Sequence, residues 1–104
     1  MEKYKVNLTK EATGELERIF YYITHNLKEP TTARNLYNKI LNAVFSLKYF
    51  PERNRDASYY GICDKYTRRL RVEKYIILYD VDIYNKDVYI THIFHSKQNY
   101  LNLI

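Results

Sequence analysis

The sequence predicts one α+β domain over residues 1–104: an N-terminal strand, an antiparallel helical hairpin, and three antiparallel strands forming one twisted sheet covered on one face. Two observations predict this class. Apolar and polar residues alternate in the first and last parts of the chain, whereas the middle follows the 3.6-residue period of helices. In addition, 46% of the 104 residues are apolar and only two are Gly and two are Pro, which suits a single modest core.

The chain opens with a predicted half-buried strand over residues 3–9, where apolar and polar residues alternate. Thr9 can cap the helix that follows, and Glu11 is favourable in its first turn. The apolar residues of this first helix recur at helical spacing: Ala12, Leu16, Ile19, Phe20, Ile23 and Leu27.

A second helix is predicted from Pro30, which suits a first helical turn, to Pro51, which is expected to end it. Because only a few residues connect the two helices, they should form an antiparallel hairpin. The apolar face of the second helix comprises Ala33, Leu36, Tyr37, Ile40, Val44 and Leu47.

Three strands are predicted after a polar loop at 51–64, and tight turns should join them. Asn85, in the second turn, is expected to adopt a left-handed conformation. The tail from residue 96 to 104 is expected to form a helical turn. The predicted strands cover 66–72, 75–81 and 88–94, the middle one nearly continuously apolar as a central strand should be.

The composition narrows the function classes. A net charge of +5 favours an acidic protein, nucleic acid or ribosome as partner. There is no run of eighteen apolar residues and no signal-peptide pattern, so the protein is expected in the cytoplasm and without membrane contact. Cys63 is the only cysteine, which rules out an internal disulfide. No zinc spacing, P-loop or dinucleotide fingerprint occurs, and neither metal nor cofactor is expected.

The strand at 66–72 carries a cluster of basic residues. Its alternation puts Leu70 and Val72 on the core face and Arg69 and Arg71 together on the other. Two neighbouring guanidinium groups on an open sheet face can clamp a phosphate. The competing interpretation is that both arginines only keep the surface soluble.

Two histidines lie three residues apart on the last strand, so a regular strand would place them on opposite faces. His92 alternates with Ile90 and Phe94 and is predicted to be a hydrogen-bonded core residue. His95 ends the strand, where its imidazole could act as a general acid or base. A plain surface histidine fits that position equally well.

Several segments, in this order and spacing, resemble toxins of the RelE/ParE superfamily. The resemblance covers nearly the whole chain and implies the toxic half of a type II toxin–antitoxin pair, neutralised by an antitoxin that wraps around it. RelE-like members cleave messenger RNA on the ribosome through its 2′-hydroxyl, whereas ParE-like members inhibit DNA gyrase. The segments are Leu8-Thr9-Lys10-Glu11-Ala12, Pro30-Thr31-Thr32-Ala33, Leu47-Lys48-Tyr49-Phe50-Pro51, the run from Arg69 to Tyr79, and the run from Ile93 to Tyr100.

The resemblance implies roles for five residues. Arg69 and Arg71 match basic strand positions of RelE-like enzymes that hold the scissile phosphate. Lys97 falls near a catalytic arginine that stabilises developing charge, and His95 or Tyr100 would move protons. Such a site is a metal-independent endoribonuclease that works by electrostatic stabilisation and requires no cofactor.

One residue departs from the RelE-like pattern: Ile76 stands where an arginine follows the tyrosine of the strand. The long hairpin and the Phe50-Pro51 junction look more ParE-like. On balance the sequence favours growth arrest by ribosome-dependent mRNA cleavage. Gyrase inhibition without nuclease activity is the first alternative, and a non-toxic nucleic-acid-binding module is the second.

The resemblance and the basic charge together imply a cognate antitoxin as partner. Its contribution is expected to be an acidic, amphipathic segment lying across the helices or the basic sheet face. The apolar tail residues Leu101, Leu103 and Ile104 are expected either to join that interface or to pack on the core.

Overall fold

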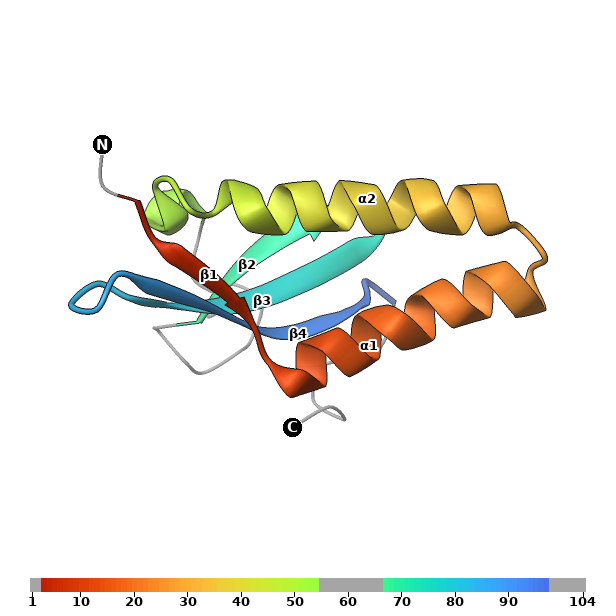
Figure 1. The fold of residues 1–104 in the computed structure, drawn as a ribbon, viewed down its shortest axis with the longest axis horizontal. Coiled ribbons are helices and arrows are strands. Elements are labelled where there is room, and N and C mark those ends of the chain that lie inside the picture. Colours follow the sequence, from red (N-terminus) through yellow and green to blue (C-terminus); the bar gives the residue numbers. More distant parts are fainter. Residues whose placement is uncertain (1–2, 55–66, 98–104) are drawn as a thin grey trace.

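The computed structural model describes residues 3–54 and 67–97. Residues 55–64 of the predicted polar loop, with Cys63, and the tail beyond Lys97, with Tyr100, lie outside these residues. Within them the predicted order of elements is confirmed (Figure 1). The elements are β1 (Lys5–Leu8), α1 (Lys10–Tyr21), the π-helical turn η1 (Tyr22–Asn26), α2 (Pro30–Ser46), the 3-10 turn η2 (Pro51–Arg53), β2 (Thr67–Val72), β3 (Tyr75–Asp82) and β4 (Asp87–His95).

The strands form one four-stranded sheet in the order β1-β4-β3-β2. The pairs β2–β3 and β3–β4 are antiparallel, whereas β1 runs parallel to β4. This arrangement confirms a mainly antiparallel sheet. It also makes the N-terminal strand an edge strand that pairs only with β4, the last strand in the described residues.

The start of α1 confirms the predicted cap. The Thr9 hydroxyl accepts a hydrogen bond from the Ala12 amide at 3.2 Å and donates one to the Ile90 carbonyl at 2.7 Å. Thr9 therefore satisfies an orphan amide of the helix and ties the helix to β4 at the same time.

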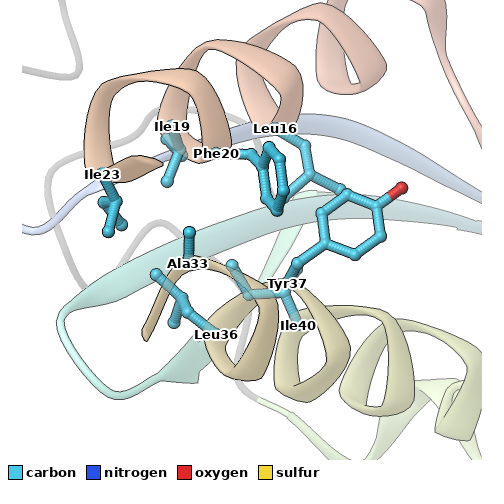
Figure 2. A pocket seen from close by; sticks show the side chains of 8 residues that line it. All are labelled: Leu16, Ile19, Phe20, Ile23, Ala33, Leu36, Tyr37 and Ile40. Atoms are coloured by element: carbon cyan, nitrogen blue, oxygen red, sulfur yellow. The ribbon is translucent and has the colours of Figure 1, made fainter. Parts of the chain in front are cut away.

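The two helices face each other through apolar side chains. Figure 2 shows Leu16, Ile19, Phe20 and Ile23 directed towards α2. The rings of Phe20 and Tyr37 meet edge to face with centroids 5.6 Å apart. In Figure 1 the connection between the helices projects beyond the ends of the strands.

The end of α2 differs from the prediction that Pro51 terminates it. The helix ends at Ser46, and the hydroxyl of that residue turns back to the Ala43 carbonyl at 2.6 Å. Pro51 instead begins η2, directly after Phe50, whose backbone is left-handed with φ 50°. Proline supplies the fixed φ of a first helical turn here.

Apolar residues from both helices, from alternate positions of β3 and from three positions of β4 form the core. The sheet contributes Ile77, Tyr79, Val88, Ile90 and Ile93 to it, and all are almost completely buried. The opposite face of the sheet also carries buried apolar residues, namely Ile76, Leu78 and Phe94.

The β3–β4 turn corrects one prediction. Lys86, and not Asn85, has the left-handed backbone, with φ 58°. Asn85 is committed elsewhere, because its side chain donates a hydrogen bond to Asp82 Oδ2 at 2.8 Å and its amide donates to Asp82 Oδ1 at 3.1 Å. In the part of the chain that is described, no helix is long and apolar enough to cross a membrane.

Candidate functional site

The two arginines of β2 lie where the sequence predicted. Arg69 is paired with Leu78 and Arg71 with Ile76 across the β2–β3 ladder, and paired residues share a face. Leu70, between the arginines, packs against the helix-side core. Both guanidinium groups therefore belong to the face that turns away from the helices.

The partners of Arg71 define its surroundings. Its Nε atom donates a hydrogen bond to the Glu73 carbonyl at 2.8 Å, which holds the side chain along the β2–β3 turn. The residue is exposed, whereas its cross-strand partner Ile76 is buried. Ile76 is in turn paired with Phe94 of β4, so Arg71 stands at the end of an apolar row.

A bulge in β4 changes which histidine joins the arginines. Tyr79 is paired with Ile90 but Leu78 with His92, so Thr91 is an extra residue between them. His92 therefore shares a face with Leu78 and not with Ile90. Arg69, Leu78 and His92 form one row across three strands.

His92 is hydrogen-bonded, as predicted, but it lies outside the core, on the face opposite Ile90, and its partner is on a helix. Its Nδ1 atom lies 3.2 Å from Glu15 Oε1, and the same oxygen accepts a hydrogen bond from the Ile93 amide at 3.1 Å. The Glu15 carboxylate of α1 thus accepts a backbone hydrogen bond from the part of β4 that lies beyond its pairing with β1. The same carboxylate orients the imidazole and favours a proton on Nδ1.

His95 lies on the other side of the sheet from the arginines. It is paired with Tyr75, which packs against the helix-side core, and their rings meet edge to face at 5.3 Å. Burial raises the pKa of the Tyr75 hydroxyl, and the charges of Glu73 and Tyr22 raise it further. The His95 Nδ1 atom accepts a hydrogen bond from the Lys97 amide at 3.1 Å.

The structure therefore brings Arg69, Arg71 and His92 onto one face and leaves His95 on the other. Lys97 follows the end of β4 at the same end of the sheet, and Tyr100 lies outside the described residues. Two guanidinium groups on a common face can bind a phosphate or an acidic side chain. Among residues 3–54 and 67–97, no cluster of His, Asp and Glu could hold a metal ion.

Sequence reasoning missed Glu15. Its signal is an acidic residue on the helix face that also carries Ala12, Leu16 and Ile19. A carboxylate in that position is expected to have a buried partner. The partner itself, a backbone amide of β4, cannot be read from side chains.

This α+β arrangement, with a helical hairpin on a four-stranded sheet and an arginine-rich edge strand, has the fold of the RelE/ParE superfamily. A family model described as the ParE toxin of type II toxin–antitoxin systems matches residues 6–100, and the chain belongs to that family. No curated protein is similar enough to this chain to count as a relative.

Three solved structures give the same fold at low sequence identity. A chain of the chromosomal ParDE system of P. aeruginosa is 17% identical with a TM-score of 0.75, covering 93% of this chain and 100% of its own. A chain of the RelBE2 toxin–antitoxin complex of Mycobacterium tuberculosis is 20% identical with a TM-score of 0.65, covering 94% and 97%. The isolated RelE toxin of E. coli is 12% identical with a TM-score of 0.53, covering 96% and 92%.

Proposed function

We propose that this toxin arrests growth in the cytoplasm by binding a protein target, DNA gyrase, and that it does not cleave messenger RNA. The single observation that carries the proposal is the separation of His95 from Arg69 and Arg71 by the sheet. Because of this separation we favour gyrase as the target, whereas the sequence alone favours mRNA cleavage.

RNA cleavage without a metal requires several cations and a proton-transfer group around one phosphate. Arg71 supplies one cation, but the residue facing it across the ladder is the buried Ile76. The histidine at the strand end meets Tyr75 on the helix side. Arg69 and Arg71 are thus divided from His95, three of the five residues to which the resemblance assigns a catalytic role.

The match to the ParE family model supports the same choice, because the resemblance implies gyrase inhibition for ParE-like members. A toxin of this type needs a binding surface and no reacting groups. The arginine-rich face of β2 can provide such a surface for acidic side chains.

A ribonuclease remains the second candidate because of His92. This residue shares a face and a cross-strand row with Arg69, two strand spacings or roughly 10 Å away. The Glu15 carboxylate orients its ring, as carboxylates do for acid–base histidines. In this version of the enzyme, His92 would replace His95 as the proton-transfer group.

A cognate antitoxin completes the proposal. The solved structures of similar fold include a RelBE2 toxin–antitoxin complex from Mycobacterium tuberculosis and a RelE–RelB complex from Pyrococcus horikoshii. The net charge of +5 suits an acidic partner. Growth arrest by this chain alone, relieved by the protein encoded beside it, is the expected behaviour, and harmless overproduction of folded protein would favour a non-toxic module instead.

Two assays test the target. Supercoiling by purified gyrase should be blocked by added toxin, and primer extension on mRNA from toxin-expressing cells should show intact transcripts. Arg71→Ala should weaken the block, whereas Arg34→Ala, an exposed arginine on α2, should leave it unchanged. Ribosome-dependent cleavage that is lost in His92→Ala, together with normal supercoiling, would establish the ribonuclease instead.

A further inference from the structure

Aromatic and basic side chains gather where the end of α2, η2 and the start of β1 meet. They surround an open hollow of about 470 Å³, whose wall includes Tyr4, Phe50 and Pro51. We call this the Phe50 surface, and define it by Tyr4, Lys48, Tyr49, Phe50, Arg53 and Lys86.

Phe50 contributes little to the fold and is held in an unfavourable conformation. Its side chain is 63% exposed, and its backbone is left-handed, a region that bulky residues avoid. The proline that follows disfavours helical conformations at this position as well. A strained and exposed aromatic residue is better explained by a partner than by the core.

The basic residues of the surface are positioned by its own aromatic rings and carbonyls. The Lys48 ammonium lies 5.4 Å from the Tyr49 ring centroid, and the Lys86 ammonium lies 5.2 Å from that of Tyr4. Arg53 donates to the carbonyls of Ser46 and Tyr49 at 3.2 and 2.6 Å, and to the Ser46 hydroxyl at 2.7 Å.

These contacts favour an acidic protein segment over nucleic acid. A phosphate is best held by a guanidinium with free donors, but the Arg53 donors already bond to the protein. The positive field remains and attracts carboxylates at longer range. The hollow beside Phe50 has an aromatic and proline wall that suits an apolar side chain.

We propose that the antitoxin docks an acidic segment on the Phe50 surface and inserts one apolar side chain into the hollow. The inference rests on the proposed antitoxin partner and adds where and by which chemistry it is held. Glu52, the acidic residue of the hollow, is paired with Arg68 at 3.7 Å, so its charge is partly balanced within the toxin.

The Phe50 surface is distinct from the candidate site. Lys5 of β1, which follows Tyr4, is paired with Asp87 at the start of β4, whereas the row of Arg71 and Ile76 reaches β4 at Phe94, one residue before its end. The nine residues of β4 separate the two ends by roughly 26 Å. A segment bound here would leave Arg71 uncovered, and so would anchor the antitoxin without itself blocking that residue.

Calorimetric titration of the toxin with the protein encoded beside it tests the inference. Phe50→Ala should weaken binding at least tenfold, and Lys48→Glu with Lys86→Glu should weaken it further and reduce its salt dependence. Tyr21→Ala is the matched control, since Tyr21 is 62% exposed on the far hairpin end, and it should bind normally. Phe50→Gly, which suits the left-handed backbone, guards against a folding defect.

Each outcome is decisive. Unchanged affinity in Phe50→Ala, Phe50→Gly and the double charge reversal would overturn the Phe50 surface while leaving the antitoxin partner intact. Failure of the wild-type toxin to bind its neighbour would overturn the antitoxin proposal, and this inference with it. Phe50-dependent binding of a twelve-nucleotide single-stranded RNA, with normal antitoxin affinity, would assign the surface to nucleic acid.

Discussion

Arg71 and Ile76 are direct cross-strand partners at the turn end of β2 and β3, an exposed cation facing a side chain that is 6% exposed. The buried isoleucine occupies the position where the RelE-like pattern carries an arginine. The apolar row that it forms with Phe94 stabilises this end of the sheet.

Ile76→Ala should lower the free energy of unfolding by about 2–4 kcal/mol, because it removes buried methyl groups and leaves a cavity. Urea denaturation followed by circular dichroism measures the loss. Ile83→Ala is the control, since Ile83 is exposed beside the β3–β4 turn and its loss should cost roughly 0.5 kcal/mol or less. Equal stability of the two variants would show that Ile76 is not packed as described.

Glu15→Ala should destabilise the protein by about 1–3 kcal/mol, because the Ile93 amide loses its acceptor. Glu15→Gln keeps an oxygen for that amide and should cost less. Thermal denaturation of both variants measures the order of their stabilities. Glu17→Ala, at an exposed position, is the control. Gln and Ala variants of equal stability would mean that the hydrogen bond from the Ile93 amide contributes nothing to stability.

Tyr79→Phe should cost about 1–3 kcal/mol, because the hydroxyl donates to the Pro51 carbonyl at 2.7 Å and accepts from Asn54 at 3.0 Å. Burial raises the pKa of Tyr79, so the folded state favours its neutral form. That stability is complete below the unfolded pKa of about 10 and is lost as the pH rises towards the folded value. The difference in the free energy of unfolding between wild type and Tyr79→Phe should therefore narrow above pH ~10. Tyr84→Phe, the control, should have the same free energy of unfolding as wild type throughout.

Asn85→Ala should raise the pKa of the Asp82 carboxyl towards its ordinary value. The side-chain hydrogen bond from Asn85 is the main cause of the lowered pKa, followed by the backbone hydrogen bond from the same residue. The stability of the turn from ionised Asp82 is present above the unfolded pKa of about 3.9 and is lost as the pH falls through the folded value. Carboxyl ¹³C titration measures the shift, and Asn38→Ala should leave it unchanged.

Phe50→Gly should stabilise the isolated toxin by roughly 0.5–1 kcal/mol, because glycine adopts the left-handed backbone without a steric penalty. Tyr21→Gly should destabilise it by about 1 kcal/mol, since Tyr21 is helical. Differential scanning calorimetry compares them. A destabilised Phe50→Gly variant would contradict the strain assigned to Phe50.

Local chemistry made much of the fold predictable. The Thr9 cap and the alternation of β2 depend only on near neighbours in the chain, and both were confirmed. The predicted face of Arg69 and Arg71 follows from the same period-2 rule. These features required no knowledge of what packs against them.

The candidate site was less predictable because its geometry depends on contacts across strands. Because Thr91 is an extra residue, the residues after it lie on the sheet face opposite to the one that regular alternation from Ile90 would give them. The threonine side chain itself does not predict a bulge. His92 and His95 therefore exchanged the expected faces. In the β3–β4 turn, Asn85 bonds to Asp82 and leaves the left-handed position to Lys86.

The parallel pairing of β1 with β4 has a consequence for synthesis of the toxin. Lys5–Leu8 pairs with Asp87–Ile90, so the first strand has no partner until the last strand has left the ribosome. At a typical elongation rate of about 5–20 residues per second, that delay lasts several seconds. The hairpin can form during this interval, but the sheet cannot close at its β1 edge. The β1 edge of the sheet is therefore the part of the fold that forms last, after β4 becomes available for pairing.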